Sequence, residues 1–394
     1  VAEGESDVGW RDHVSEVQAL LRGELLLGAP PSDLTETIAR IALGGPATCA
    51  LRAFQRVLDV PQTGCDPAVR LAACRVGWAF RSYFNRPESM AAIRSGHAET
   101  PYWRRVIEYA IEGCLTAATD EWAHVLREAI GLLDPSARDG PERLSDAMVE
   151  AITTRIAWHD VDEVTVKDGA VLTEKRSMRA HFAMRFASER TEDQKQLSRE
   201  SQVRAAFNSP FWPFVLASTS VGQEGLDFHQ FCHAVVHWNL PPNPVDLEQR
   251  EGRVHRYKNH AIRRNVARRH GSAAIRTPGS GGGAFDPWAA AFRMALCDAP
   301  VGDPGLTPYW IYDPPELACP VMVERHVAYL PLSRDEARLR MLKRSLAAYR
   351  LVFGQPRQDD LMEFLQGRFD EATLAAWAEE VRVDLAPSTT GLGR

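Results

Sequence analysis

The stretches that decide the fold are PFVLASTSVGQEGLDFH at residues 213–229 and NLPPNPVDLEQREGRVHR at residues 239–256. The first begins with an apolar run at 214–218, and a second apolar run, AVVHW, follows at 234–238. Each run is short and continuous, which is typical of a strand buried on both faces of a parallel sheet. Helical patterns flank both runs, so the sequence predicts an α/β layer architecture.

A loop of small and polar residues follows the first predicted strand. Ligands of open α/β sheets bind beyond the carboxyl ends of the strands, where this loop would lie. Gly225 would let the backbone approach a ligand closely. Thr219, Ser220 and Asp227 would supply oriented polar groups. The loop is therefore a candidate ligand-binding segment.

The second stretch carries the signals of a helix start. Asn243 is a good N-cap, and Pro244 suits the first helical position. Gln249, Arg253 and Arg256 are spaced by four and three residues, which predicts that they share one face of the helix. Two guanidinium groups projected together can bind a polyphosphate, because each presents a rigid and permanently charged donor fork.

These motifs resemble those of a known family. Gly-x-Glu-Gly-Leu-Asp at 222–227 and Gln-Arg-x-Gly-Arg-x-x-Arg at 249–256 resemble motifs V and VI of helicase superfamily two. The segment 239–250 is most similar to Swi/Snf-type translocases of the bacterial RNA-polymerase-associated (RapA-like) branch, and RAAFN at 204–208 is similar to an Arg–Phe element of that family. After Arg256 the sequence reads YKNH, where that branch usually has Ile-Gly-Gln.

The resemblance implies a RecA-like helicase C-terminal lobe that works with ATP and Mg²⁺. Arg253 and Arg256 would reach the γ-phosphate of ATP held on a first RecA-like lobe, with Arg256 as the arginine finger. The implied nucleotide-binding residues are Gly225, Asp227 and Gln249. This lobe would supply its arginines to chemistry that is shared between two lobes.

The resemblance also implies a nucleic-acid track, and we expect double-stranded DNA rather than RNA. Thr219 and Ser220 would touch its backbone. Residues 250–270 contain eight Lys or Arg and one acid, a net charge of +7 inside a chain whose total is −6. A basic run beside a phosphate-directed motif favours nucleic-acid contact. The candidate contacts in it are Lys258, Arg263 and Arg264.

The sequence lacks the phosphate-binding motifs of such a helicase. It contains no G-x-x-x-x-G-K-[ST] and no acidic motif of the Asp-Glu-x-His kind. We therefore expect the first lobe, which would hold most of the Mg²⁺ contacts, to be supplied upstream or by another chain. The alternative is a non-hydrolysing nucleic-acid-binding or regulatory subunit built on a degenerate helicase lobe.

Three parts are expected along the chain. Residues 1–155 carry apolar residues at helical spacing and predict a helical scaffold or inter-lobe insert. Residues 156–330 predict the RecA-like domain, which would include a hairpin around an Asp-Gly turn near 168–169 and a Gly-rich loop near 277–284. Residues 331–394 predict a C-terminal helical extension.

Other functions find less support in the sequence. His229, Cys232, His233 and His237 lie together without a paired carboxylate or a second ligand pair, so we expect no metal site. The aromatic run at 207–214 could stack nucleic-acid bases, but core packing is the favoured interpretation. No signal sequence and no apolar run of about 18 residues is visible, and the seven cysteines form no regular pattern, so we expect a cytoplasmic protein.

Overall fold

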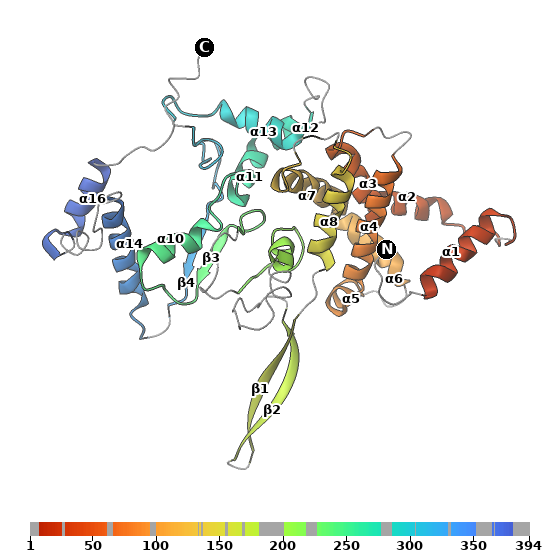
Figure 1. Cartoon of the computed structure of the whole chain (residues 1–394), viewed down its shortest axis with the longest axis horizontal. Coiled ribbons are helices and arrows are strands. Elements are labelled where there is room, and N and C mark those ends of the chain that lie inside the picture. Colours follow the sequence, from red (N-terminus) through yellow and green to blue (C-terminus); the bar gives the residue numbers. More distant parts are fainter. Residues whose placement is uncertain are drawn as a thin grey trace.

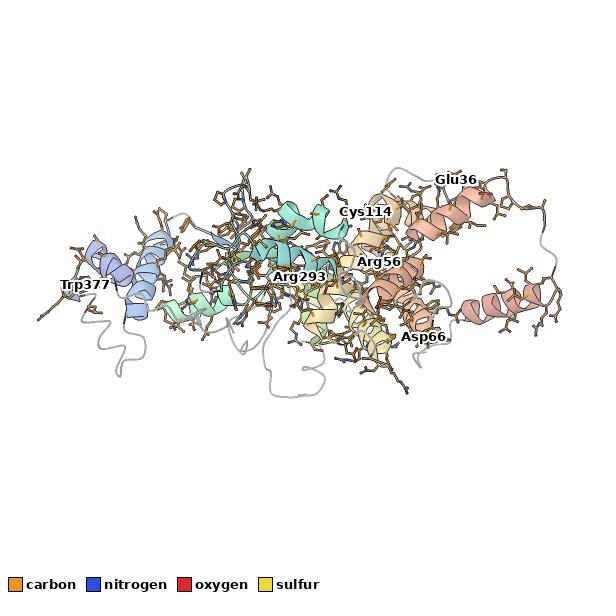
Figure 2. The ribbon with its side chains drawn as sticks, turned by 90° about the horizontal axis from the view of Figure 1, so that it is seen from above. Glu36, Arg56, Asp66, Cys114, Arg293 and Trp377 are labelled. Carbon is orange, nitrogen blue, oxygen red and sulfur yellow. The ribbon has the colours of Figure 1, made fainter. Side chains whose placement is uncertain are left out.

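The computed structural model describes residues 8–25, 28–60, 66–94, 100–132, 134, 137–153, 157–167, 170–180, 201–217, 227–276, 286–303, 305–329, 332–351, 365 and 367–380. In these residues helices extend along an elongated molecule, one small sheet lies among them, and a two-stranded hairpin projects from its middle (Figure 1). Seen from above, Glu36 of the N-terminal helices and Trp377 near the C-terminus lie toward opposite ends (Figure 2).

The N-terminal part is helical, as the apolar spacing predicted. The helices described here are α1 (Val8–Leu21), α2 (Leu34–Gly44), α3 (Pro46–Val57), α4 (Pro67–Phe84), α5 (Pro87–Arg94), α6 (Tyr102–Glu112), α7 (Leu115–Ala129) and α8 (Gly140–Thr153). Prolines occupy the first turns of α3 and α4, where their missing N–H groups cost nothing. The division of the chain at residues 155 and 330 stays a prediction.

One apolar core joins α3, α4, α7 and α8. Phe54, Phe80 and Trp122 are fully buried in it. Phe211, from the aromatic run, packs into the same core, with its ring centroid 5.1 Å from that of Phe80 and 5.5 Å from that of Trp122. Packing is therefore confirmed for this residue, although its partners are the N-terminal helices rather than a neighbouring strand.

A long hairpin follows the helices. Strands β1 (Ala157–Lys167) and β2 (Ala170–Ala180) pair antiparallel, with Lys167 opposite Ala170. Figure 1 shows the hairpin projecting away from the helices. The predicted pair of strands is confirmed. The Asp-Gly turn itself lies outside the described residues.

The second sheet is small and parallel. Strand β3 (Ala234–His237) pairs with β4 (Glu324–Val327), and Ala234 lies opposite Glu324. The elements between them are α10 (Pro244–Gly252), α11 (His260–Val266), the π-helix η1 (Ala267–Gly271), α12 (Ser272–Arg276) and α13 (Pro287–Leu296). A parallel strand at 234–238 was predicted correctly, and the mixed helices and sheet are consistent with a RecA-like lobe.

Two details of the predicted sheet are wrong. Strand β3 is not buried on both faces, because Val236 is 64% exposed in the described structure and Trp238 lies exposed just after the strand. The segment 214–217 forms an irregular stretch with one bridge residue, and Phe214 is exposed. Pro213 lacks an N–H group for a strand ladder, which disfavours a strand at this point.

The C-terminal helices pack on this region. They are α14 (Asp335–Leu351) and α16 (Glu371–Glu380). Leu339 and Leu342 of α14 are buried against Leu240 and Leu247. This contact packs α14 against α10 and the residues just before it. No helix among the described residues has the length and apolarity to cross a membrane.

Glu251 fastens α10 to the small sheet. Its Oε1 lies 3.1 Å from Nε2 of His237 on β3, and Arg325 of β4 donates to both carboxylate oxygens. Burial raises the pKa of Glu251, but the hydrogen bonds with Arg325 and His237 outweigh burial and lower the pKa to about 2. One ionised carboxylate therefore joins a helix to both strands.

Replacing Phe80 with Ala should lower the free energy of unfolding of the helical part by about 3–5 kcal/mol, because a large ring leaves a cavity in a packed core. Leu71→Ala is the matched control, since Leu71 lies on the same helix and is 65% exposed. It should change stability by less than about 0.5 kcal/mol. Urea unfolding followed by the helical circular dichroism signal checks both, and equal midpoints for the two variants would contradict this core.

The Glu251 cluster predicts a pH dependence of stability. The folded-state pKa of about 2 lies below the ordinary value of 4.5, so the ionised group stabilises the fold above pH 4.5. That contribution is lost as the pH falls toward 2. The stability gap between the wild type and Glu251→Gln should therefore be wide at about pH 6 and narrow by about pH 3. Urea midpoints measured at both pH values test this, and a constant gap would show that the carboxylate is not held as described.

Candidate functional site

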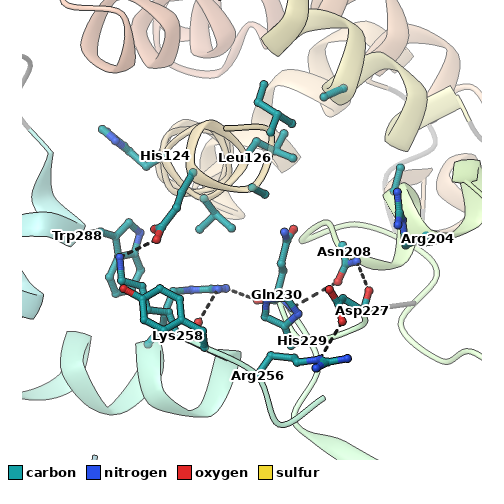
Figure 3. A pocket seen from close by; sticks show the side chains of 18 of the residues that line it. His124, Leu126, Arg204, Asn208, Asp227, His229, Gln230, Arg256, Lys258 and Trp288 are labelled. Atoms are coloured by element: carbon teal, nitrogen blue, oxygen red, sulfur yellow. Dashed lines mark hydrogen bonds and ion pairs between the residues drawn. The ribbon is translucent and has the colours of Figure 1, made fainter. Parts of the chain in front are cut away.

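A cleft of about 740 Å³ lies between the N-terminal helices and the region of the parallel sheet. Helix α7 forms one wall. The other wall comes from residues 201–208, 227–230 and 256–263, and from α13 (Figure 3). Charged side chains and aromatic rings line it together. The cleft is thus the place where the helical part meets the motif-bearing segments.

The two predicted motifs meet at this cleft. Arg256 Nε lies 2.9 Å from Asp227 Oδ1, and both side chains are about half exposed. The backbones are joined as well, because Phe228 N–H donates to the Arg253 carbonyl at 2.9 Å and His260 N–H donates to the His229 carbonyl at 2.8 Å. Residues far apart in the sequence are thereby held as one ligand-facing surface.

The helix that precedes Arg256 ends earlier than expected. Asn243 caps α10 as predicted, since its Oδ1 accepts from the Asp246 N–H at 2.8 Å. The helix stops at Gly252, with Arg253 as its C-cap residue. Arg256 therefore lies in a turn, and the prediction that Gln249, Arg253 and Arg256 share one helical face is wrong. Glycine weakens a helix, and the Arg253 carbonyl bonds outside α10 instead of continuing it.

The predicted nucleotide-binding residues have different outcomes. Asp227 lines the cleft. Gln249 is exposed on α10 and is not among the residues that line the cleft. Gly225 lies outside the described residues, as do Thr219, Ser220 and the Gly-rich loop at 277–284.

Asn208 supports the segment that carries Asp227. Its side chain is buried, its Nδ2 donates to the Asp227 carbonyl at 2.7 Å, and its Oδ1 accepts from the Gln230 N–H at 3.3 Å. A buried amide satisfied at both ends fixes the backbone between its partners. Sequence reasoning did not single out Asn208, although the quoted RAAFN element ends on it.

Arg263 is buried rather than available to nucleic acid. It is 6% exposed, and it donates to the carbonyls of Lys258, at 3.3 Å, and Gln230. Its guanidinium also lies over the rings of Phe231 and Trp288. Burial lowers the pKa of Arg263 to about 10. The prediction that it contacts nucleic acid is contradicted, because the group is enclosed and holds two segments of the cleft wall together.

Lys258 is also engaged within the protein. Its Nζ lies 2.7 Å from Glu128 Oε1 on α7, and its side chain is 20% exposed. The predicted nucleic-acid contact competes with this ion pair. Sequence reasoning had no signal for the pair, because Glu128 precedes Lys258 by 130 residues.

Other basic side chains of residues 250–270 also have partners within the protein. Arg268 donates to the carbonyls of Cys319 and Ala318, and Arg269 Nε lies 2.9 Å from Asp298 Oδ2. Arg264 is exposed, and its contact with nucleic acid stays a prediction. The net charge of +7 therefore does not correspond to a fully exposed basic surface, because several of these side chains bond to neighbouring carbonyls and carboxylates.

The histidine and cysteine group has structural contacts. Within the described part of the chain, no three His, Cys, Asp or Glu side chains are arranged to hold a metal ion. His237 pairs with Glu251, and Cys232 Sγ donates to the Ala234 carbonyl at 3.3 Å. Burial lowers the pKa of His229, which lines the cleft. Carboxylate, guanidinium and ammonium groups line the cleft together with it.

Comparisons with known proteins agree with the two motifs. Residues 169–258 match the family model of the helicase conserved C-terminal domain. The chain is also 50% identical over 42 residues to the uncharacterized ATP-dependent helicase YqhH of Bacillus subtilis (strain 168), a match that covers 11% of this chain and 7% of that protein. No solved structure matches the chain. The family match and the similar helicase both support a helicase C-terminal domain in this chain.

Proposed function

We propose that this chain is the C-terminal half of an ATP-dependent nucleic-acid helicase or translocase that acts on double-stranded DNA. The observation that carries the proposal is the Asp227–Arg256 pair, which lies at an open cleft. Its two residues come from the segments that resemble motifs V and VI, and both segments fall within the stretch matching a helicase C-terminal domain.

The exposure of Arg256 supports its proposed role as an arginine finger. Its guanidinium is about half exposed, and an ion pair at that exposure contributes only about 0–1 kcal/mol. Exchanging Asp227 for a phosphoryl group would therefore cost little. A guanidinium that reaches a transferring phosphoryl group stabilises the negative charge spread over its oxygens.

Arg253 adds a second cation close by. Burial and the neighbouring Arg250 lower the pKa of Arg253, so its charge is already disfavoured in this position. Arg253 is not among the residues that line the cleft, so its role toward ATP rests on the resemblance to motif VI.

Binding of ATP and Mg²⁺ requires a phosphate-binding loop that these residues do not contain. A bound Mg²⁺ ion would neutralise charge on the ATP phosphates. The phosphate-binding loop that goes with it is missing from these 394 residues. We assign that part to a first RecA-like lobe, in the same polypeptide or in another chain. Gly225 and Gln249 toward the nucleotide, and Thr219, Ser220 and Arg264 toward nucleic acid, belong to the proposal as predicted.

The finer assignments rest on the resemblance. The similarity of residues 239–250 to Swi/Snf-type, RapA-like translocases favours DNA as the track and translocation as the activity. A cytoplasmic location follows from the same proposal. Lys258 and Arg263 are left out of the nucleic-acid contacts, since one is paired with Glu128 and the other is buried.

A second candidate is a non-hydrolysing nucleic-acid-binding or regulatory subunit on a degenerate helicase lobe. The observation that favours it is the occupied state of Arg256, whose partner in the structure is an aspartate of the same chain. Such a subunit would bind nucleic acid with no dependence on ATP.

The test is ATP hydrolysis by the complete product of the reading frame that encodes this chain, with and without double-stranded DNA. Arg256→Ala should lower kcat by about 10³-fold or more, which is the range for loss of an arginine finger. Arg293→Ala is the control, because Arg293 is an exposed arginine on α13 that does not line the cleft. It should leave kcat unchanged.

Undiminished hydrolysis by Arg256→Ala would overturn the finger assignment. If the complete wild-type product binds DNA without hydrolysing ATP, the regulatory subunit is the correct function. DNA binding by fluorescence anisotropy, with RNA of the same sequence as a competitor, distinguishes the two tracks.

A further inference from the structure

Helix α7 touches the turn that carries Arg256. Glu128 lies near the end of α7, and its Oε1 is 2.7 Å from Nζ of Lys258, two residues beyond Arg256. Figure 3 shows Lys258 in the cleft, and both Glu128 and Lys258 are among the residues that line it. Through the contact of Glu128 with Lys258 the N-terminal helices are tied to the segment that resembles motif VI.

The Lys258 ammonium also has an aromatic surround. It lies 5.2 Å from the ring centroid of Tyr257, 5.0 Å from that of Phe292 and 5.9 Å from that of Tyr309. A cation at such distances is attracted to the ring faces. Three rings and one carboxylate thus give the side chain a single defined place.

The backbone at Lys258 needs this anchoring. Its φ is 50°, in the left-handed region that side chains other than glycine rarely adopt. Its N–H donates to the Tyr309 carbonyl at 2.9 Å, and its carbonyl accepts from Arg263. A strained backbone persists only where its surroundings determine it from several sides. Here they do so directly beside Arg256.

We propose that Lys258 is a positioning residue for Arg256 and that Glu128 of α7 is its anchor, so that the N-terminal helices hold the arginine-bearing turn in one conformation. The inference rests on the proposed function, since it concerns the orientation of Arg256, the proposed arginine finger. Glu128 is about half exposed, and exposed ion pairs contribute little to overall stability. We therefore expect the effect of the pair to be measurable at the turn rather than in global unfolding.

Amide hydrogen exchange tests the anchoring without any ATP hydrolysis. Glu128→Gln keeps the shape and removes the charge, so the Lys258 amide should exchange roughly two- to fivefold faster, the factor that corresponds to an exposed ion pair. Glu142→Gln, at an exposed acid of α8 that does not line the cleft, should leave this amide unchanged. Unchanged exchange in Glu128→Gln would overturn the inference, whatever the ATPase shows.

Kinetics of the complete gene product test the positioning. Lys258→Gln should lower kcat about tenfold with KM nearly unchanged, because a finger displaced by a fraction of an ångström loses transition-state contact. Lys258→Arg keeps the charge and should restore most of kcat.

A rise in KM with unchanged kcat in Lys258→Gln would contradict a positioning role. If exchange at Lys258 responds as expected while the wild type hydrolyses no ATP, the anchor stands and the proposed function fails, so the two failures are distinguishable.

Discussion

The cleft depends on the contact between residues 227–230 and the turn at 253–260. Two backbone hydrogen bonds join these segments, and Asn208 and Arg263 brace them from either side. Without that contact Asp227 and Arg256 would have no reason to lie 2.9 Å apart, since they come from segments separated by a strand and a helix. The residues of the two motifs form one site only because these two segments are in contact.

Local chemistry was predictable where a few neighbouring residues determine the structure. The Asn243 cap, the start of α10 and the strands around an Asp-Gly turn all follow from short-range rules. The end of α10 was not predictable in this way, because helical spacing continues through Arg256 while the chain leaves the helix to bond with Phe228. The apolar run at 214–217 was misleading as well, since Phe214 and Val215 are exposed in the structure rather than buried in a sheet.

Contacts between side chains far apart in the sequence are what the sequence alone could not predict. A run of lysine and arginine resembles an open surface for nucleic acid, yet Lys258, Arg268 and Arg269 have acceptors contributed by α7 and by residues 298–319. The net charge of a sequence segment depends only on its composition. The electrostatic potential at the protein surface also depends on which charged groups are paired after folding. The roles of Thr219, Ser220 and Gly225 stay predictions, because these residues lie outside the described part of the chain.

The buried guanidinium of Arg263 has a consequence for which residue can occupy its position. Enclosure lowers its pKa to about 10, which still leaves it charged at neutral pH. A lysine begins at roughly 10.4, and a similar loss would bring its ammonium close to neutrality. Lysine also offers no planar fork to span two carbonyls. The wall of the cleft therefore relies on the one side chain that can be both enclosed and permanently cationic.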